Sequence, residues 1–176
     1  MLFYRYIDIE NFDKIQEEIT KFLFTKTTVL KEKLPWKFIN VSELSKENPT
    51  LVDYFRNLGL NVNVAAAVYR RPYSQGGIHV DTSIFWRVLL PVLNCQGSRT
   101  KFFEFDSSKF KQGSGWDGDR NLSLIPGHHL KFLDEFELAR PVIFNPKVPH
   151  GVYCNSKLNG PRISLTLGFD KDPKNI

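Results

Sequence analysis

The spacing of apolar residues divides the chain into a helical first third and a strand-rich remainder. After Asn11, which is expected to cap a helix, apolar residues recur every three or four positions, as on one face of an amphipathic helix. They are Phe12, Ile15, Ile19, Phe22 and Leu23. A second helix is predicted from about Pro49 to Leu58, because proline suits a first helical turn and Gly59 suits the stop. We therefore expect residues 1–60 to form a helical N-terminal part.

From Val62 onward, short runs of apolar and β-branched residues alternate with turn residues. Strands are predicted near residues 62–70, 77–80, 84–93, 100–105, 121–125, 129–138, 141–145, 150–154 and 162–169. Many short strands with no helix between them indicate a sandwich or barrel over residues 62–169. The stretch 106–121, with its lone Trp116, is long enough to be a functional lid, and residues 170–176 are expected to be a solvated tail.

The size and charge of the chain narrow the class of protein. A chain of 176 residues is expected to be a single domain, and its 15 Phe residues favour a β-rich interior. The 24 Lys and Arg residues exceed the 19 Asp and Glu residues, for a net charge of +5. Because the basic residues are scattered along the sequence, nucleic-acid binding is not favoured as the main function.

The cysteines and the N-terminal segment predict a cytoplasmic protein. Cys95 and Cys154 form no CxxC motif and no disulfide framework, which is typical of reduced thiols. The first ten residues lack the apolar core of a signal peptide. The longest apolar run, residues 84–93, is too short to span a membrane, so no membrane partner is expected.

The strongest chemical signal is the triplet His79-Val80-Asp81 together with the distant His150. In an extended segment residues i and i+2 face the same side, so His79 and Asp81 can converge on one ion. Pro146 and Pro149 stiffen the turn before His150. Two imidazoles and one carboxylate are the ligand set of a non-haem Fe(II) site with open positions. The alternative is an ordinary turn with a solvated Asp81, and His150 as a core histidine.

A candidate anion site follows near the end of the sequence. Arg162 opens the apolar strand predicted at 162–169, and a buried guanidinium needs an anion or a strong acceptor. Ser164 lies two residues on, so it shares the face of Arg162 and can donate to the same anion. The alternative is that Arg162 pairs with a structural carboxylate.

Taken together, these residues resemble the 2-oxoglutarate- and Fe(II)-dependent oxygenases. The family pattern is His-x-Asp, a distal His and then Arg-x-Ser near the C-terminus of the domain, matched here by His79-Val80-Asp81, His150 and Arg162-Ile163-Ser164. The resemblance covers residues 62–169 and points to the prolyl-hydroxylase-like or aspartyl/asparaginyl-hydroxylase-like branch. It implies a mainly β fold with N-terminal helices, a double-stranded β-helix (jelly-roll, cupin-like barrel).

The resemblance also implies roles for individual residues. His79, Asp81 and His150 would be the catalytic iron ligands, and Arg162 and Ser164 would bind the cosubstrate 2-oxoglutarate. Further candidates for cosubstrate binding, each carried by one branch of the family, are Tyr69 and Arg87. Tyr69 can equally be a core aromatic, and Arg87 a surface residue of an edge strand.

Other polar residues near these motifs are not assigned to the site. Thr100 and Lys101 open a strand, and their directions stay open. His128 and His129 are adjacent and point to opposite faces of a strand, so both cannot join the site, and they are expected to be structural.

The implied activity is a hydroxylase that couples oxidative decarboxylation of 2-oxoglutarate to C–H oxidation by dioxygen. The substrate is either a small molecule or a protein side chain, and the oligomeric state is open. One rival is a cupin-like metalloprotein without 2-oxoglutarate, which predicts metal binding but no functional effect of replacing Arg162. The other is a non-catalytic jelly-roll binding module for carbohydrate or protein, which the aromatic richness and Trp116 would serve.

Overall fold

The structure, a computed structural model, describes residues 2–81, 85–105, 115–116, 121–122, 130–154 and 160–176. The helices are α1 (Phe12–Thr25), α2 (Val29–Glu32), α3 (Val41–Glu47), α4 (Pro49–Asn57) and the 3-10 helix η3 (Pro173–Asn175). The first strands are β1 (Tyr4–Tyr6), β2 (Trp36–Ile39), β3 (Val62–Arg70), β4 (Arg87–Leu93) and β5 (Ser98–Phe105). The others are β6 (Gly115–Trp116), β7 (Asn121–Leu122), β8 (Leu130–Glu137), β9 (Val142–Phe144), β10 (His150–Cys154) and β11 (Arg162–Phe169).

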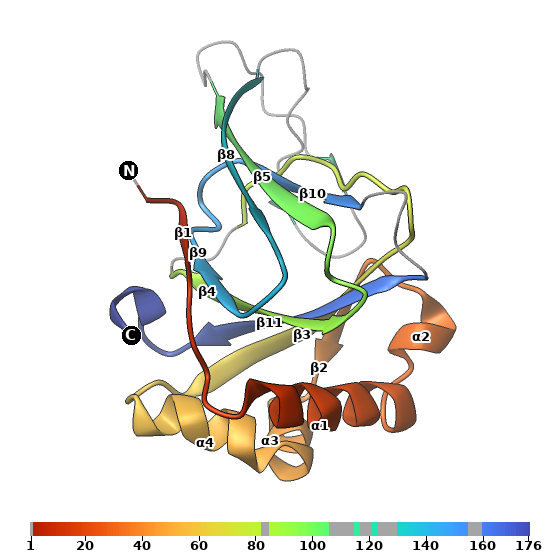
Figure 1. The fold of residues 1–176 in the computed structure, drawn as a ribbon, viewed down its shortest axis with the longest axis vertical. Helices are drawn as coiled ribbons and strands as arrows, with labels where there is room; N and C mark the ends of the chain where they lie inside the picture. The colour runs from red at the N-terminus through yellow and green to blue at the C-terminus, as the bar shows by residue number, and fades with distance from the viewer. Residues whose placement is uncertain (1, 82–84, 106–114, 117–120, 123–129, 155–159) are drawn as a thin grey trace.

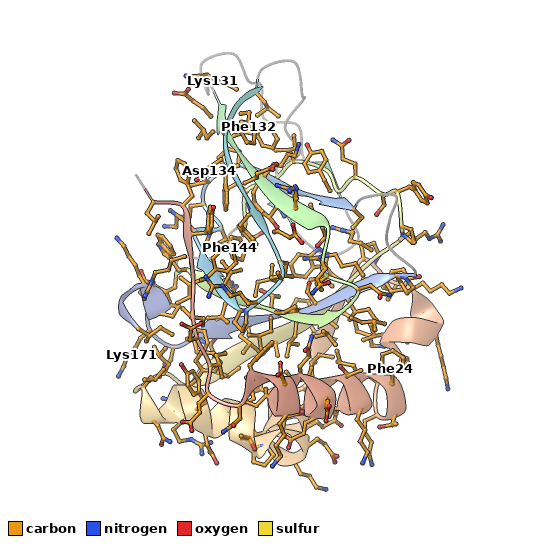
Figure 2. All side chains as sticks on the ribbon, in the orientation of Figure 1. Phe24, Lys131, Phe132, Asp134, Phe144 and Lys171 are labelled. Carbon is orange, nitrogen blue, oxygen red and sulfur yellow. The ribbon has the colours of Figure 1, made fainter. Side chains whose placement is uncertain are left out.

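Two antiparallel sheets face each other. The large sheet has the strand order β1-β9-β4-β11-β3-β2, and the small sheet has the order β10-β5-β8. Figure 1 shows helices α1, α3 and α4 beneath the large sheet, with the small sheet over its other face. Figure 2 shows Phe144 in the space between the two sheets, where it packs in a core cluster with Phe102 and Phe136 of the small sheet. This arrangement confirms the predicted jelly roll with N-terminal helices.

Strand β11 is buried along its whole length because both of its faces are covered. Successive side chains of a strand point to opposite faces. One set packs in the core between the large sheet and the helices, and it consists of Ile163, Leu165, Leu167 and Phe169. The other set faces the small sheet, and three of its members, Arg162, Ser164 and Thr166, line a cavity between the sheets.

The N-terminal part is less helical than predicted. The two predicted helices are present as α1 and α4, with Pro49 in the first turn of α4 and Gly59 at φ +75° after it. However, β1 and β2 are edge strands of the large sheet, too short to show a period in the sequence. Asn11 occupies the N-cap position of α1 as predicted, but it has φ 55° and its side chain makes no capping hydrogen bond.

The later strands mostly match the prediction, with two corrections. The segment predicted as a strand at 77–80 forms only an isolated bridge, between His79 and His150. The predicted solvated tail instead contains η3, whose Pro173 is buried, and the preceding Asp170 accepts hydrogen bonds from the backbone and side chain of Asn61.

Some predictions concern residues that the structure does not describe. Most of the predicted lid at 106–121, the second half of the strand predicted at 121–125, and both His128 and His129 lie outside the described residues. Within the described part, no helix is both long and apolar enough to cross a membrane.

Two leucines at α4 test how far the helices contribute to the core. Leu51 is 0% exposed and Leu58 is 45% exposed. We expect Leu51→Ala to lower the free energy of unfolding by about 2–5 kcal/mol, because it leaves a cavity in the core. Leu58→Ala is expected to cost less than about 1 kcal/mol. Urea unfolding measures both variants, and equal losses would show that α4 does not pack as described.

Candidate metal centre and anion pocket

The two histidines are brought together by their own backbones. His79 lies in the segment after β3 and His150 begins β10, and each donates its backbone N–H to the carbonyl of the other at 2.9 Å. Their ring centroids are 4.5 Å apart, and the side chains are 5% and 4% exposed. The isolated bridge therefore fixes two imidazoles side by side between the sheets.

Each imidazole is held by a local backbone carbonyl. Nδ1 of His79 lies 2.8 Å from the oxygen of Gly77, and Nδ1 of His150 lies 2.9 Å from the oxygen of Val148. Because a carbonyl oxygen can only accept, Nδ1 carries the proton and Nε2 keeps its lone pair. Such backbone partners orient the histidines of metal sites. Nε2 of His79 is buried and has no hydrogen-bond partner, so it is available to a metal ion.

Asp81 completes the set. Its backbone N–H donates to the oxygen of Pro146 at 2.9 Å, and its Oδ1 lies 3.5 Å from Nε2 of His79. The ligand atoms of His79, Asp81 and His150 all lie within 4.8 Å of one another. Two neutral imidazoles and one carboxylate fit a divalent ion such as Fe(II), with coordination positions left open on the side away from the protein ligands.

Burial keeps His150 neutral. Loss of hydration, and to a smaller extent the neighbouring His79, lower its pKa from 6.5 to about 4, although Asp81 and the carbonyl of Val148 oppose the shift. The rings of Phe144 and Phe102 lie 5.3 and 6.2 Å from the imidazole, centroid to centroid, and help to exclude water. A neutral histidine is the form that binds a metal, so no proton has to be displaced from Nε2 at neutral pH.

Arg162 lies in the same cavity as the three candidate ligands. It is 1% exposed, and its Nε donates to Oγ of Ser98 at 3.0 Å. Its Nη1 and Nη2 are buried and have no hydrogen-bond partner among the residues that the structure describes. Among the described residues no carboxylate pairs with Arg162, which does not support the structural-carboxylate alternative.

Around Arg162 the cavity lining offers hydrogen-bond donors, whereas the acceptors Nε2 of His79 and the carboxylate of Asp81 belong to the candidate metal site. Besides Nη1 and Nη2 of Arg162, the lining contains three buried polar atoms without a partner that can all donate, namely Nε1 of Trp36, Oγ1 of Thr100 and Oγ of Ser164. Buried polar groups are normally hydrogen-bonded, so a set of free donors indicates an acceptor-rich ligand such as a carboxylate. The cavity volume is about 30 Å³, enough for about one water molecule.

Two predicted binding residues are not brought to this cavity. Tyr69 pairs with Ile163 and packs with it in the core between the large sheet and the helices, as the core-aromatic alternative expects. Arg87 lies on the cavity side of the large sheet, but its guanidinium occupies the space that a side chain on Gly168 would fill, and it does not line the cavity. Because side chains of a β-strand point alternately to its two faces, Tyr69 lies on the face opposite to its neighbours Val68 and Arg70, which line the cavity.

The structure shows which way the side chains of Thr100 and Lys101 point, and it adds two residues near the cavity that the sequence did not reveal. Thr100 faces the cavity and is 2% exposed, whereas Lys101 faces outward and its Nζ lies 3.7 Å from Oε2 of Glu135. Strand β5 begins at Ser98, two residues earlier than predicted, so Ser98 shares the face of Thr100. Trp36 reaches the cavity from the unpredicted strand β2. Because side chains two residues apart in a strand share a face, the sequence would have placed Ser98 beside Thr100 if the start of β5 had been known.

Comparison with solved structures establishes the class of fold. No family model matches the sequence, and no curated protein matches it. Several solved structures nevertheless share the fold of this chain over nearly its whole length.

Three of these structures cover most of both chains. HygX from Streptomyces hygroscopicus with iron bound has a TM-score of 0.56 at 11% identity, over 95% of this chain and 81% of that chain. The epimerase SnoN, in complex with Fe3+, alpha ketoglutarate and nogalamycin RO, has a TM-score of 0.52 at 9% identity, over 93% and 77%. AviO1 from Streptomyces viridochromogenes Tue57 has a TM-score of 0.51 at 9% identity, over 97% and 91%. At these identities the likeness shows the fold alone.

The low pKa of His150 predicts a pH-dependent stability. Its folded pKa of about 4 lies below the ordinary 6.5, so the unfolded chain binds the proton more readily. The free energy of unfolding of the metal-free protein should therefore fall as the pH drops from 6.5 toward 4, by about 2 kcal/mol between pH 7 and pH 5. Urea unfolding with a chelator measures this loss. In His150→Asn the loss should shrink by that amount, and an unchanged pH dependence would contradict the assignment to His150.

Proposed function

We propose that this protein is a 2-oxoglutarate- and Fe(II)-dependent oxygenase, acting as a hydroxylase on a small molecule or a protein side chain. One observation carries the proposal. The same cavity contains a His-Asp-His ligand set and a buried guanidinium whose two terminal nitrogens have no partner. A facial set of two histidines and a carboxylate is characteristic of non-haem Fe(II) oxygenases.

The residues divide the work between the two ends of the cavity. His79, Asp81 and His150 would hold Fe(II), and Arg162 would hold the distal carboxylate of 2-oxoglutarate, assisted by the hydroxyl of Ser164. When bound, Fe(II) and 2-oxoglutarate supply the chemistry of dioxygen activation and C–H oxidation, which protein side chains lack. The phenylalanines beside His150 would keep the metal end dry.

The charges of the site support a dianionic cosubstrate. Asp81 offsets one charge of a divalent metal, and Arg162 adds one, so these groups together carry two positive charges. A dicarboxylate neutralises both, and Arg70, which also lines the cavity, adds to the positive potential. A guanidinium also matches a carboxylate in shape, through two parallel hydrogen bonds.

The solved structures that share this fold support the same interpretation. One of them holds iron, and another holds Fe3+ together with alpha ketoglutarate. The cupin-like alternative without 2-oxoglutarate leaves the free donors of Arg162 unexplained. The non-catalytic alternative leaves the paired, neutral histidines unexplained. The identity of the substrate is not part of the proposal.

The metal centre is tested first, by titrating Mn(II) or Fe(II) anaerobically into metal-free protein. We expect Asp81→Asn to weaken metal binding by more than about 100-fold, because it removes the anionic ligand at constant size. Asp53→Asn is the matched control, since Asp53 is exposed on α4 and pairs only with Arg56 among the described residues. Equal affinities for wild type and Asp81→Asn would overturn the metal assignment.

The cosubstrate site is tested by calorimetry of 2-oxoglutarate binding to Mn(II)-loaded protein. Arg162→Lys keeps the charge but loses the two parallel N–H donors of the guanidinium. We expect the affinity of this variant for 2-oxoglutarate to fall roughly 10- to 100-fold, with metal binding unchanged. The matched control is Arg56→Lys on the surface of α4. If the wild type binds metal but not 2-oxoglutarate, the cupin-like alternative is favoured. If it binds neither, the binding module is favoured.

A further inference from the structure

We propose that the turn at residues 94–98 is a positioning element for Arg162, and that Ser98 makes the guanidinium present only its two terminal nitrogens to a carboxylate. Ser98 is thus a positioning residue for cosubstrate binding, at a site that neither the sequence motif nor the fold comparison points to. The inference rests on the function proposed above, because it concerns how Arg162 receives 2-oxoglutarate.

The turn holds the backbone on both sides of Arg162. The side-chain amide of Asn94 donates to the carbonyl of Pro161 at 3.1 Å. The thiol of Cys95 donates to the carbonyl of Ile163 at 3.0 Å. Burial raises the pKa of this thiol, so it stays protonated and remains a donor. The carbonyl groups of the residues immediately before and after Arg162 are therefore both tied to one turn.

Ser98 holds the side chain of Arg162 as well. Its hydroxyl donates to the carbonyl of Cys95 at 2.6 Å and accepts from Nε of Arg162 at 3.0 Å. A hydroxyl has one proton, so the bond to Cys95 turns its lone pairs toward Nε. Ser98 and Arg162 are each 1% exposed, so water does not compete for these bonds.

The turn itself is fixed in shape. Asn94 and Gly97 both have left-handed backbone conformations, with φ 49° and 78°. The backbone N–H of Ser98 donates to the carbonyl of Cys95 at 3.1 Å, and that of Gly97 donates to Oε1 of Glu137 on β8 at 2.8 Å. The turn therefore joins β4 to β5 while also bonding to β8 and β11, and it can act as a rigid support.

This support decides how the guanidinium meets an anion. A guanidinium can face a carboxylate side-on, through Nε and one Nη, or end-on, through Nη1 and Nη2. Because Ser98 occupies Nε, only the end-on edge is free, and both of its nitrogens lack a partner. Because Nη1 and Nη2 are held in place before binding, less conformational entropy is lost when the ligand binds.

The test compares Ser98→Ala with Ser74→Ala in Mn(II)-loaded protein. Ser74 is a matched control because its hydroxyl makes the same bond, to the carbonyl three residues earlier at 2.6 Å, and it does not line the cavity. We expect Ser98→Ala to weaken 2-oxoglutarate binding roughly 10-fold and Ser74→Ala to leave it unchanged. Affinity for Mn(II), and for 2-oxobutyrate, which lacks the distal carboxylate, should not change in either variant.

A double-mutant cycle separates positioning from a general loss of structure. In an Arg162→Lys background, Ser98→Ala should weaken 2-oxoglutarate binding by less than about 2-fold, because the Nε that it orients is gone. If Ser98→Ala does not fold, Asn94→Gly serves instead, since it keeps the left-handed backbone and removes one tie, and about a 3-fold loss is expected.

The outcomes distinguish this inference from the proposed function. Unchanged 2-oxoglutarate binding in Ser98→Ala, or an equal loss of 2-oxobutyrate and metal binding, would overturn the positioning role while leaving the proposed function standing. Failure of the wild type to bind 2-oxoglutarate would overturn the proposed function itself. A selective loss for the dicarboxylate that disappears in the Arg162→Lys background supports the inference.

Discussion

The two-residue alternation of β11 is the constraint on which the rest of the structure depends. Ile163 and Leu165 have to be covered on one face, and the helices of the N-terminal part cover them. Arg162 and Ser164 are thereby placed on the opposite face, inside the space between the two sheets. A slip of one residue would bury the guanidinium against the helices, at a large cost in free energy. The hydrophobic core and the candidate anion pocket therefore lie on opposite faces of β11, and the register of this strand fixes both.

The sequence predicted the fold class and the main strands because their signals are local. Apolar alternation marked β3 and β11, and Pro49 and Gly59 marked α4. The short strands β1 and β2 exist only because they pair with longer neighbours, and nothing in three or four residues indicates that pairing. In the same way, the spacing of His79, Asp81 and His150 is visible in the sequence. Trp36 reaches the cavity, and Ser98 reaches Arg162, through pairings that no local pattern records. Tyr69 lies on the face of β3 away from the cavity, because its place in the strand, not its residue type, decides which face it joins.

The electrostatic character of the cavity comes from an imbalance that the protein maintains without a ligand. Burial favours the neutral form of His150 at one end, and the guanidinium of Arg162 is a permanent charge at the other. The hydroxyl of Ser98 satisfies one N–H of that guanidinium but does not neutralise it. Within the part of the chain that the structure describes, no carboxylate pairs with this guanidinium, so its burial costs stability.

The bridge between His79 and His150 has a consequence for the order of events during folding. Its two strand segments are far apart in the sequence, and the bridge consists of only two hydrogen bonds. Closing so long a loop costs more entropy than two bonds return, so the bridge can persist only after the surrounding sheets have paired. The imidazoles thus meet late, on a chain that is already compact. A nascent chain would have no preformed site with which to sequester a metal ion, and capture of the ion would mark the completion of folding rather than its start.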